Sequence, residues 1–191
     1  MDIEHDIAET VIRELSPKRY RHTLLTVELC VELAKRFNLD RRRAWIASMW
    51  HDIAREWDEQ KLEQYVSRRS IAVEPLERKV PMLLHGPVAA ELLEERYVLD
   101  DREIWNAVRW HTTGHPDMGA LGYALFAADY LEPGRTHISR EDQDTILAAG
   151  SLERMICEIY RRQFAYFVKA GITVEPKAVM LFEQLEKTIA G

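Results

Sequence analysis

The chain has 191 residues, of which 47% are apolar and 30% charged, and its formal net charge is -6. This balance and length predict one globular domain over residues 1–191, and the acidic charge argues against a general nucleic-acid binder while allowing a small anionic substrate. No apolar run approaches the ~20 residues that span a bilayer, and the acidic start lacks the apolar segment of a signal peptide, so we expect a cytoplasmic protein without a membrane partner.

Apolar side chains recur with helical spacing along most of the chain, and no strand pattern is convincing. The expected helices cover about residues 3–15, 19–37, 41–52, 58–69, 85–97, 101–111, 120–131, 152–170 and 176–189. Asp40, Asp58, Asp100 and Ser151 are the expected caps. Pro75 and Pro81 mark loops in the least periodic stretch. The predicted fold class is therefore all-α, a single helical bundle.

Three of these helices carry residues that could bind a metal. His22 is expected in the first turn of its helix and the adjacent pair His51 and Asp52 in the last turn of the next, while Asp129 lies near the end of a later helix. Antiparallel neighbours would bring a helix start beside a helix end, so these side chains can converge. Two imidazoles and two carboxylates favour iron, manganese or cobalt over a closed zinc site. A bound metal would lower the pKa of water near neutral pH.

Further polar residues could bind phosphate. His85 stands at a helix start, where backbone N–H groups favour an anion. Arg135, just after the turn that follows Asp129, can present a bidentate guanidinium. His111 lies at a helix end. The alternatives are a capping or partly buried role for each histidine and a surface ion pair for Arg135, and the residues alone do not decide between them.

Short motifs surround these residues. They are Arg19-Tyr20-Arg21-His22-Thr23-Leu24, His51-Asp52-Ile53-Ala54, Leu84-His85-Gly86-Pro87-Val88-Ala89-Ala90, His111-Thr112-Thr113-Gly114 with Met118, and Ala128-Asp129-Tyr130-Leu131-Glu132-Pro133-Gly134-Arg135. The order of His22, His51-Asp52 and Asp129 resembles the HD superfamily of metal-dependent phosphohydrolases. Together the motifs resemble one subfamily, the YqeK type of bacterial symmetrical dinucleoside tetraphosphatases, from about Arg19 to beyond Gly171.

This resemblance implies an all-helical HD-domain fold, a bound iron, and hydrolysis of diadenosine tetraphosphate to two ADP. It assigns the metal to His22, His51, Asp52 and Asp129. Catalytic contacts with the phosphates fall to His85, His111 and Arg135. Contacts with the substrate or with ADP extend over His22, His85, His111, Thr112, Asp129 and Arg135, and a nucleoside contact over Lys169, Ala170, Gly171, Ile172, Thr173 and Val174. Trp50 departs from the aliphatic residue usual before the His-Asp pair, which changes packing behind the metal.

Other functions stay open at this stage. One alternative is a broader nucleotide phosphohydrolase, and another is a non-catalytic sensor that binds a nucleotide and signals to a partner. A cyclic-dinucleotide phosphodiesterase is disfavoured because the Gly-Tyr-Pro signature of that relative is absent. The sequence leaves open whether a second ion joins through His85 or His111, and whether the protein is a monomer or a homodimer.

Overall fold

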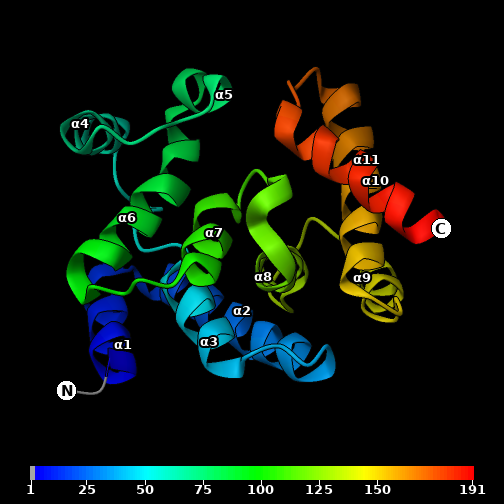
Figure 1. Ribbon diagram of the computed structural model, residues 1–191, viewed down its shortest axis with the longest axis horizontal. Helices are drawn as coiled ribbons and strands as arrows, with labels where there is room; N and C mark the ends of the chain where they lie inside the picture. The colour runs from blue at the N-terminus through cyan, green and yellow to red at the C-terminus, as the bar shows by residue number, and fades with distance from the viewer. Residues whose placement is uncertain (1–2) are drawn as a thin grey trace.

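The structure, a computed structural model, describes residues 3–191, which fold into helices joined by short turns, with no strand among them (Figure 1). The helices are α1 (Ile3–Glu14), α2 (Pro17–Arg36), α3 (Arg41–Trp50), α4 (Glu59–Arg69), α5 (Pro75–Lys79), α6 (His85–Tyr97), α7 (Arg102–Trp110), α8 (Gly119–Leu131), α9 (Arg140–Leu147), α10 (Leu152–Ala170) and α11 (Pro176–Ala190), with 3₁₀ turns η1 (Pro81–Leu84) and η2 (Pro116–Met118). The all-α prediction is confirmed. None of the described helices combines the length and apolar character required to cross a membrane.

Side-chain caps set many of the helix starts. The Asp40 carboxylate accepts the backbone N–H groups of Arg42 and Arg43, and Asp58 and Ser151 cap α4 and α10 in the same way. These three caps were expected from the sequence. The expected cap Asp100 is wrong: Asp101 accepts the N–H groups that open α7, so the helix begins one residue later.

Two segments are more helical than the sequence pattern predicts. Pro75 and Pro81, expected to mark loops, each occupy the first turn of a helical segment, α5 and η1, where a missing N–H costs nothing. The helix α9 was not predicted. Ser139 caps it and two acidic residues stand in its first turn, a signal that was present but lies in a short polar stretch with little apolar periodicity.

The apolar helix α8 lies at the centre of the bundle and contacts α2, α3, α7 and α10 (Figure 1). Buried apolar side chains from Ile7 to Leu185 form one continuous cluster. The single domain over residues 1–191 stays a prediction. Trp50 is fully buried at the end of α3, and its indole N–H donates to the carbonyl of Ala89 in α6 at 2.8 Å. The helices α10 and α11 pack together on the far side of α8, opposite α1 and α4.

Candidate active site

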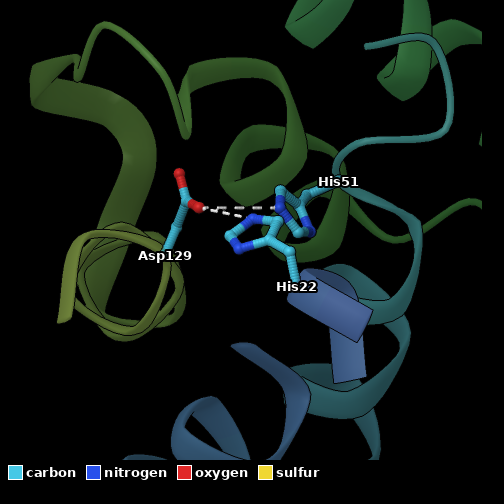
Figure 2. Close-up of side chains that lie close together, drawn as sticks. All are labelled: His22, His51 and Asp129. Carbon is cyan, nitrogen blue, oxygen red and sulfur yellow. Dashed lines mark ion pairs between the residues drawn. The ribbon is translucent and has the colours of Figure 1, made fainter. Parts of the chain in front are cut away.

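Histidine and aspartate side chains from α2, α3 and α8 meet at the centre of the bundle (Figure 2). The His22 Nε2 atom lies 3.0 Å from Asp129 Oδ1, and His51 Nε2 lies 3.8 Å from the same oxygen. Asp52 Oδ2 lies 3.6 Å from His22 Nε2 and 3.5 Å from His51 Nε2. The four residues that the sequence nominated as metal ligands therefore converge on one point.

Two local positions differ from the prediction. The helix α2 begins at Pro17, so His22 stands in its second turn and not its first. The helix α3 ends at Trp50, and His51 and Asp52 follow it, with His51 as the C-cap. The antiparallel arrangement of α2 and α3 still brings these side chains together, because the connection between the helices is short.

The buried imidazole of His51 is oriented toward the cluster. Its Nδ1 atom lies 2.6 Å from the carbonyl oxygen of Ser48 and must donate to it, which leaves the Nε2 lone pair free. His51 Nε2 is buried and has no hydrogen-bond partner. Burial lowers the pKa of His51 to about 4, so the imidazole is neutral at neutral pH. A neutral, unpaired nitrogen of this kind is suited to a metal ion.

The two carboxylates are held ionised. Burial opposes their ionisation, but the neighbouring histidines, with Arg135 beside Asp129, lower the pKa of both Asp52 and Asp129 below the ordinary value. The pKa of His22 shifts in the opposite direction, above its ordinary value. Burial favours the neutral imidazole, but the hydrogen bond to Asp129 raises the pKa. Neutral His51 and two anionic carboxylates form a mixed nitrogen and oxygen donor set that fits a divalent transition metal.

Two residues that support the ligands were missed in the sequence. Glu132 is buried, and its Oε1 atom accepts the N–H of His22 Nδ1 at 3.1 Å, which directs Nε2 toward the cluster. Arg19 donates from Nη1 to Asp52 Oδ2 at 2.8 Å. In the sequence, Glu132 stood out only as a turn residue and Arg19 only as a cation flanking a motif. Their partners lie 110 and 33 positions away along the chain, respectively, and no local spacing indicates such contacts.

A second group of side chains lies near the other carboxylate oxygen of Asp52, Oδ1. His85 Nε2 and His111 Nε2 are 3.1 Å apart, and Asp52 Oδ1 lies 3.5 Å and 3.7 Å from them. The Thr112 hydroxyl lies 3.0 Å from His85 Nε2. Burial, and then the charge of His111, lowers the pKa of His85 to about 3. His85 therefore presents a neutral imidazole and not a cation.

Arg135 lies beside the metal-ligand candidates on the solvent side. Its Nη2 donates to Asp129 Oδ1, its Nε donates to the carbonyl oxygen of Asp129 at 2.7 Å, and Nη2 lies 3.5 Å from His22 Nε2. The ion pair that the sequence alternative allowed for Arg135 is present, but it is partly buried and its partner is the metal-ligand candidate Asp129. Its guanidinium therefore places a positive charge beside the carboxylate of Asp129.

Two cavities open on either side of Thr112. The α8–α10 cavity, of about 800 Å³, is lined by His111, Asp129, Tyr130, Arg135, Arg162 and Tyr166 among others. The α10–α11 cavity, of about 400 Å³, includes Ile172, Thr173 and Val174 in its wall. The remaining residues of the expected nucleoside contact, Lys169, Ala170 and Gly171, are exposed and line neither cavity.

Residues 19–134 match the model of the HD domain family. A symmetrical bis(5'-nucleosyl)-tetraphosphatase of Staphylococcus aureus is 34% identical over 94% of this chain and 92% of its own length, and one of Bacillus subtilis is 30% identical over 92% and 93%. The crystal structure of a predicted HD superfamily hydrolase involved in NAD metabolism from Clostridium acetobutylicum superposes with a TM-score of 0.88 at 25% identity, covering 96% of this chain and 97% of the other.

Proposed function

The chain belongs to the HD domain family and, within it, to the symmetrical bis(5'-nucleosyl)-tetraphosphatases, and from this membership we propose that it hydrolyses diadenosine tetraphosphate to two ADP. The observation that carries the proposal is the close approach of His22, His51, Asp52 and Asp129, whose imidazole Nε2 atoms lie 3.0–3.8 Å from the carboxylate oxygens, beside the α8–α10 cavity. When bound there, a divalent metal supplies a Lewis acid at the phosphate chain and lowers the pKa of water. The donor set supports iron, with manganese or cobalt as alternatives.

The surrounding residues act on the phosphate chain. Arg135 faces the α8–α10 cavity and contributes a fixed positive charge where negative charge spreads during phosphoryl transfer. His85, His111 and Thr112 contribute hydrogen-bonding groups. Ile172, Thr173 and Val174 contact a nucleoside through the α10–α11 cavity. The substrate is a small molecule, while the oligomeric state and the cytoplasmic location stay predictions from the sequence.

The position of cleavage tests this function. Of the three P–O–P linkages in the tetraphosphate, only the middle one yields two identical diphosphates. We expect ADP alone at early times when metal-loaded protein is given diadenosine tetraphosphate and the products are separated by chromatography. Early ATP and AMP in equal amounts would contradict symmetrical cleavage. Binding of ADP without any turnover would instead support the sensor alternative.

The number of metal ions needs a separate measurement. Asp52 has one oxygen toward His22 and His51 and the other toward His85 and His111, so the geometry supports a second ion as well as the first. Metal analysis of anaerobically purified protein distinguishes one ion per chain from two, and two ions would assign the second to His85 and His111. His85→Ala would then lose one ion and keep the other.

A further inference from the structure

A further cavity meets the metal-ligand candidates on the side of α2. This α2 cavity has a volume of about 660 Å³ and is lined by Lys18, Arg19, Arg21, His22, Glu56 and Arg135 among others. Arg135 and His137 line both this cavity and the α8–α10 cavity, so the two cavities meet at these side chains. A ligand that is longer than one cavity can therefore extend from one into the other.

The metal-ligand candidates lie at the junction of the two cavities. Asp129 lines the α8–α10 cavity and His22 lines the α2 cavity. Asp129 Oδ1 and His22 Nε2 are 3.0 Å apart (Figure 2), and Arg135 Nη2 lies 3.5 Å from the same His22 nitrogen. A phosphate chain that crosses this point leaves one half in each cavity. A tetraphosphate that is cut in the middle needs such an arrangement, because two phosphates lie on each side of its middle linkage.

The α2 cavity is positively charged although the chain is acidic overall. Its walls carry four cationic side chains and two carboxylates, whereas the whole chain has a formal net charge of -6. The carboxylate of Glu56 accepts the backbone N–H of Ser16 at 2.8 Å and the Ser16 hydroxyl at 2.6 Å. The carboxylate of Glu132 accepts from His22 Nδ1 and from the backbone N–H of Gly134. Both carboxylates are thus engaged by the protein, and the excess positive charge is available to an anion.

Two of these cations, Lys18 and Arg21, have no side-chain partner. Both are exposed, and neither side chain makes a hydrogen bond or an ion pair with any residue that the structure describes. They stand three residues apart in the first two turns of α2 and so share one face of the helix. Arg19, which lies between them in the chain, donates instead to Asp52 Oδ2. Lys18 and Arg21 therefore present free donors to phosphate oxygens in this cavity.

The charges at the start of α2 are the reverse of those that stabilise a helix. The first turn of α2 has no acidic residue and carries Lys18 and Arg19, although the positive end of the helix dipole favours negative charge there. These cations therefore repel the end of their own helix. An anion bound in the α2 cavity would offset that repulsion.

We infer that Lys18 and Arg21 bind the two phosphates of the second half of the dinucleotide in the α2 cavity, while the first half occupies the α8–α10 cavity. The inference rests on the proposed function. It explains how the site distinguishes four phosphates from two, because a nucleoside diphosphate fills only the first of these cavities. The dinucleotide should therefore bind more tightly than ADP, and the difference should depend on Lys18 and Arg21.

The test compares the double variant Lys18→Ala, Arg21→Ala with the wild type, both loaded with metal. The probe is diadenosine tetraphosphate with a methylene group in place of the middle bridging oxygen, which blocks cleavage. We expect calorimetry at about 0.15 M salt to show a roughly tenfold to hundredfold loss of affinity for this probe, and a change of less than about twofold for ADP. Adenosine tetraphosphate with the same methylene bridge should lose affinity by the same factor, because the contacts are with phosphates and not with the second nucleoside.

Two further variants serve as controls. Lys35→Ala, Arg41→Ala is the matched double variant, because both residues are exposed cations without a side-chain partner among the described residues and line none of the three cavities. It should bind every probe as the wild type does. Lys18→Arg, Arg21→Lys keeps both charges and should keep most of the affinity for the dinucleotide probe.

The outcomes separate this inference from the proposed function. Wild-type affinity of Lys18→Ala, Arg21→Ala for both tetraphosphate probes would overturn the inference, as would equal affinities of the wild type for ADP and the dinucleotide probe. A loss confined to the dinucleotide probe would move the contacts to the second nucleoside and overturn the assignment to phosphates. Wild-type protein that prefers the dinucleotide probe through these two residues but cleaves no diadenosine tetraphosphate would contradict the proposed function alone. Failure to bind any of the probes would overturn both.

Discussion

Asp52 is the residue that joins the two groups of histidines. One of its oxygens faces His22 and His51, and the other faces His85 and His111. Arg19 holds the first oxygen from the protein side. Removing its negative charge therefore affects every part of the site at once, while its position after α3 means that no helix depends on it.

Asp52→Asn should lose metal and turnover, because a neutral amide oxygen is a weaker ligand for a divalent metal than a carboxylate oxygen. Helical content, measured by circular dichroism, should stay nearly unchanged. Asp144→Asn, on the exposed face of α9, makes the same chemical change away from the site and should keep both metal and activity. Wild-type metal content and activity in Asp52→Asn would show that the site is assigned to the wrong residues.

Glu132 acts through His22 and not through the substrate. Glu132→Gln replaces a charged acceptor of the His22 N–H by a neutral one, so the imidazole becomes less basic and less firmly oriented. We expect a tenfold to hundredfold loss of metal affinity, of about the size seen for such supporting carboxylates, with activity restored by excess metal. A variant that stays inactive at saturating metal would show that Glu132 has a direct role in the reaction.

At the scale of elements, α6 and α7 approach each other closely at Gly86. A Cβ atom there would lie 2.8 Å from the backbone carbonyl oxygen of Arg109. These two helices carry His85 and His111, whose Nε2 atoms are 3.1 Å apart. The absence of a side chain at Gly86 therefore sets the spacing of the two histidines.

Gly86→Ala should force α6 and α7 apart, with a loss of about 1–3 kcal/mol in the free energy of unfolding, as for other overpacked contacts. Activity should fall further than metal content, because His85 and His111 move relative to Asp52. Gly150→Ala is the matched control, since a Cβ atom at Gly150 meets nothing within 4 Å. Denaturant unfolding and kinetics measured on both variants distinguish a spacing effect from a general intolerance of alanine.

The helices were largely predictable from the sequence, whereas the contacts between distant helices were less so. Periodicity and caps such as Asp40 and Ser151 are local signals, and these helices were found. The convergence of the metal-ligand candidates was expected because antiparallel neighbouring helices bring a helix start beside a helix end. The contacts of Glu132 and Arg19 depend on how distant helices pack, which no local pattern encodes.

At the scale of the whole molecule, the buried histidines couple folding to pH. The pKa of His51 is about 4 and that of His85 about 3 in the folded metal-free protein, both lowered first by burial. The ordinary value is about 6.5, so between pH 6.5 and 4 the unfolded chain binds protons that the folded chain does not. Stability therefore falls as the pH falls through this window, while the raised pKa of His22 offsets part of the effect.

Metal-free protein should lose on the order of 1 kcal/mol of unfolding free energy for each pH unit below about 6.5. Urea unfolding in the presence of a chelator at pH 7, 6 and 5 measures this slope. His51→Gln removes one of the two groups with a lowered pKa and should give a shallower slope. An equal slope in this variant would mean that other groups cause the acid sensitivity.

The HD family match ends at residue 134, whereas the α10–α11 cavity is walled largely by residues beyond 160. Under the proposed function, in which Ile172, Thr173 and Val174 contact the nucleoside, hydrolytic chemistry and the choice of base therefore belong to separate stretches of one gene. During descent, a lineage can accumulate changes in its last two helices and acquire a different nucleotide preference while every ligand residue stays in place. Recombination near the α9 segment would exchange the choice of base between relatives and leave the hydrolytic chemistry with the parent gene.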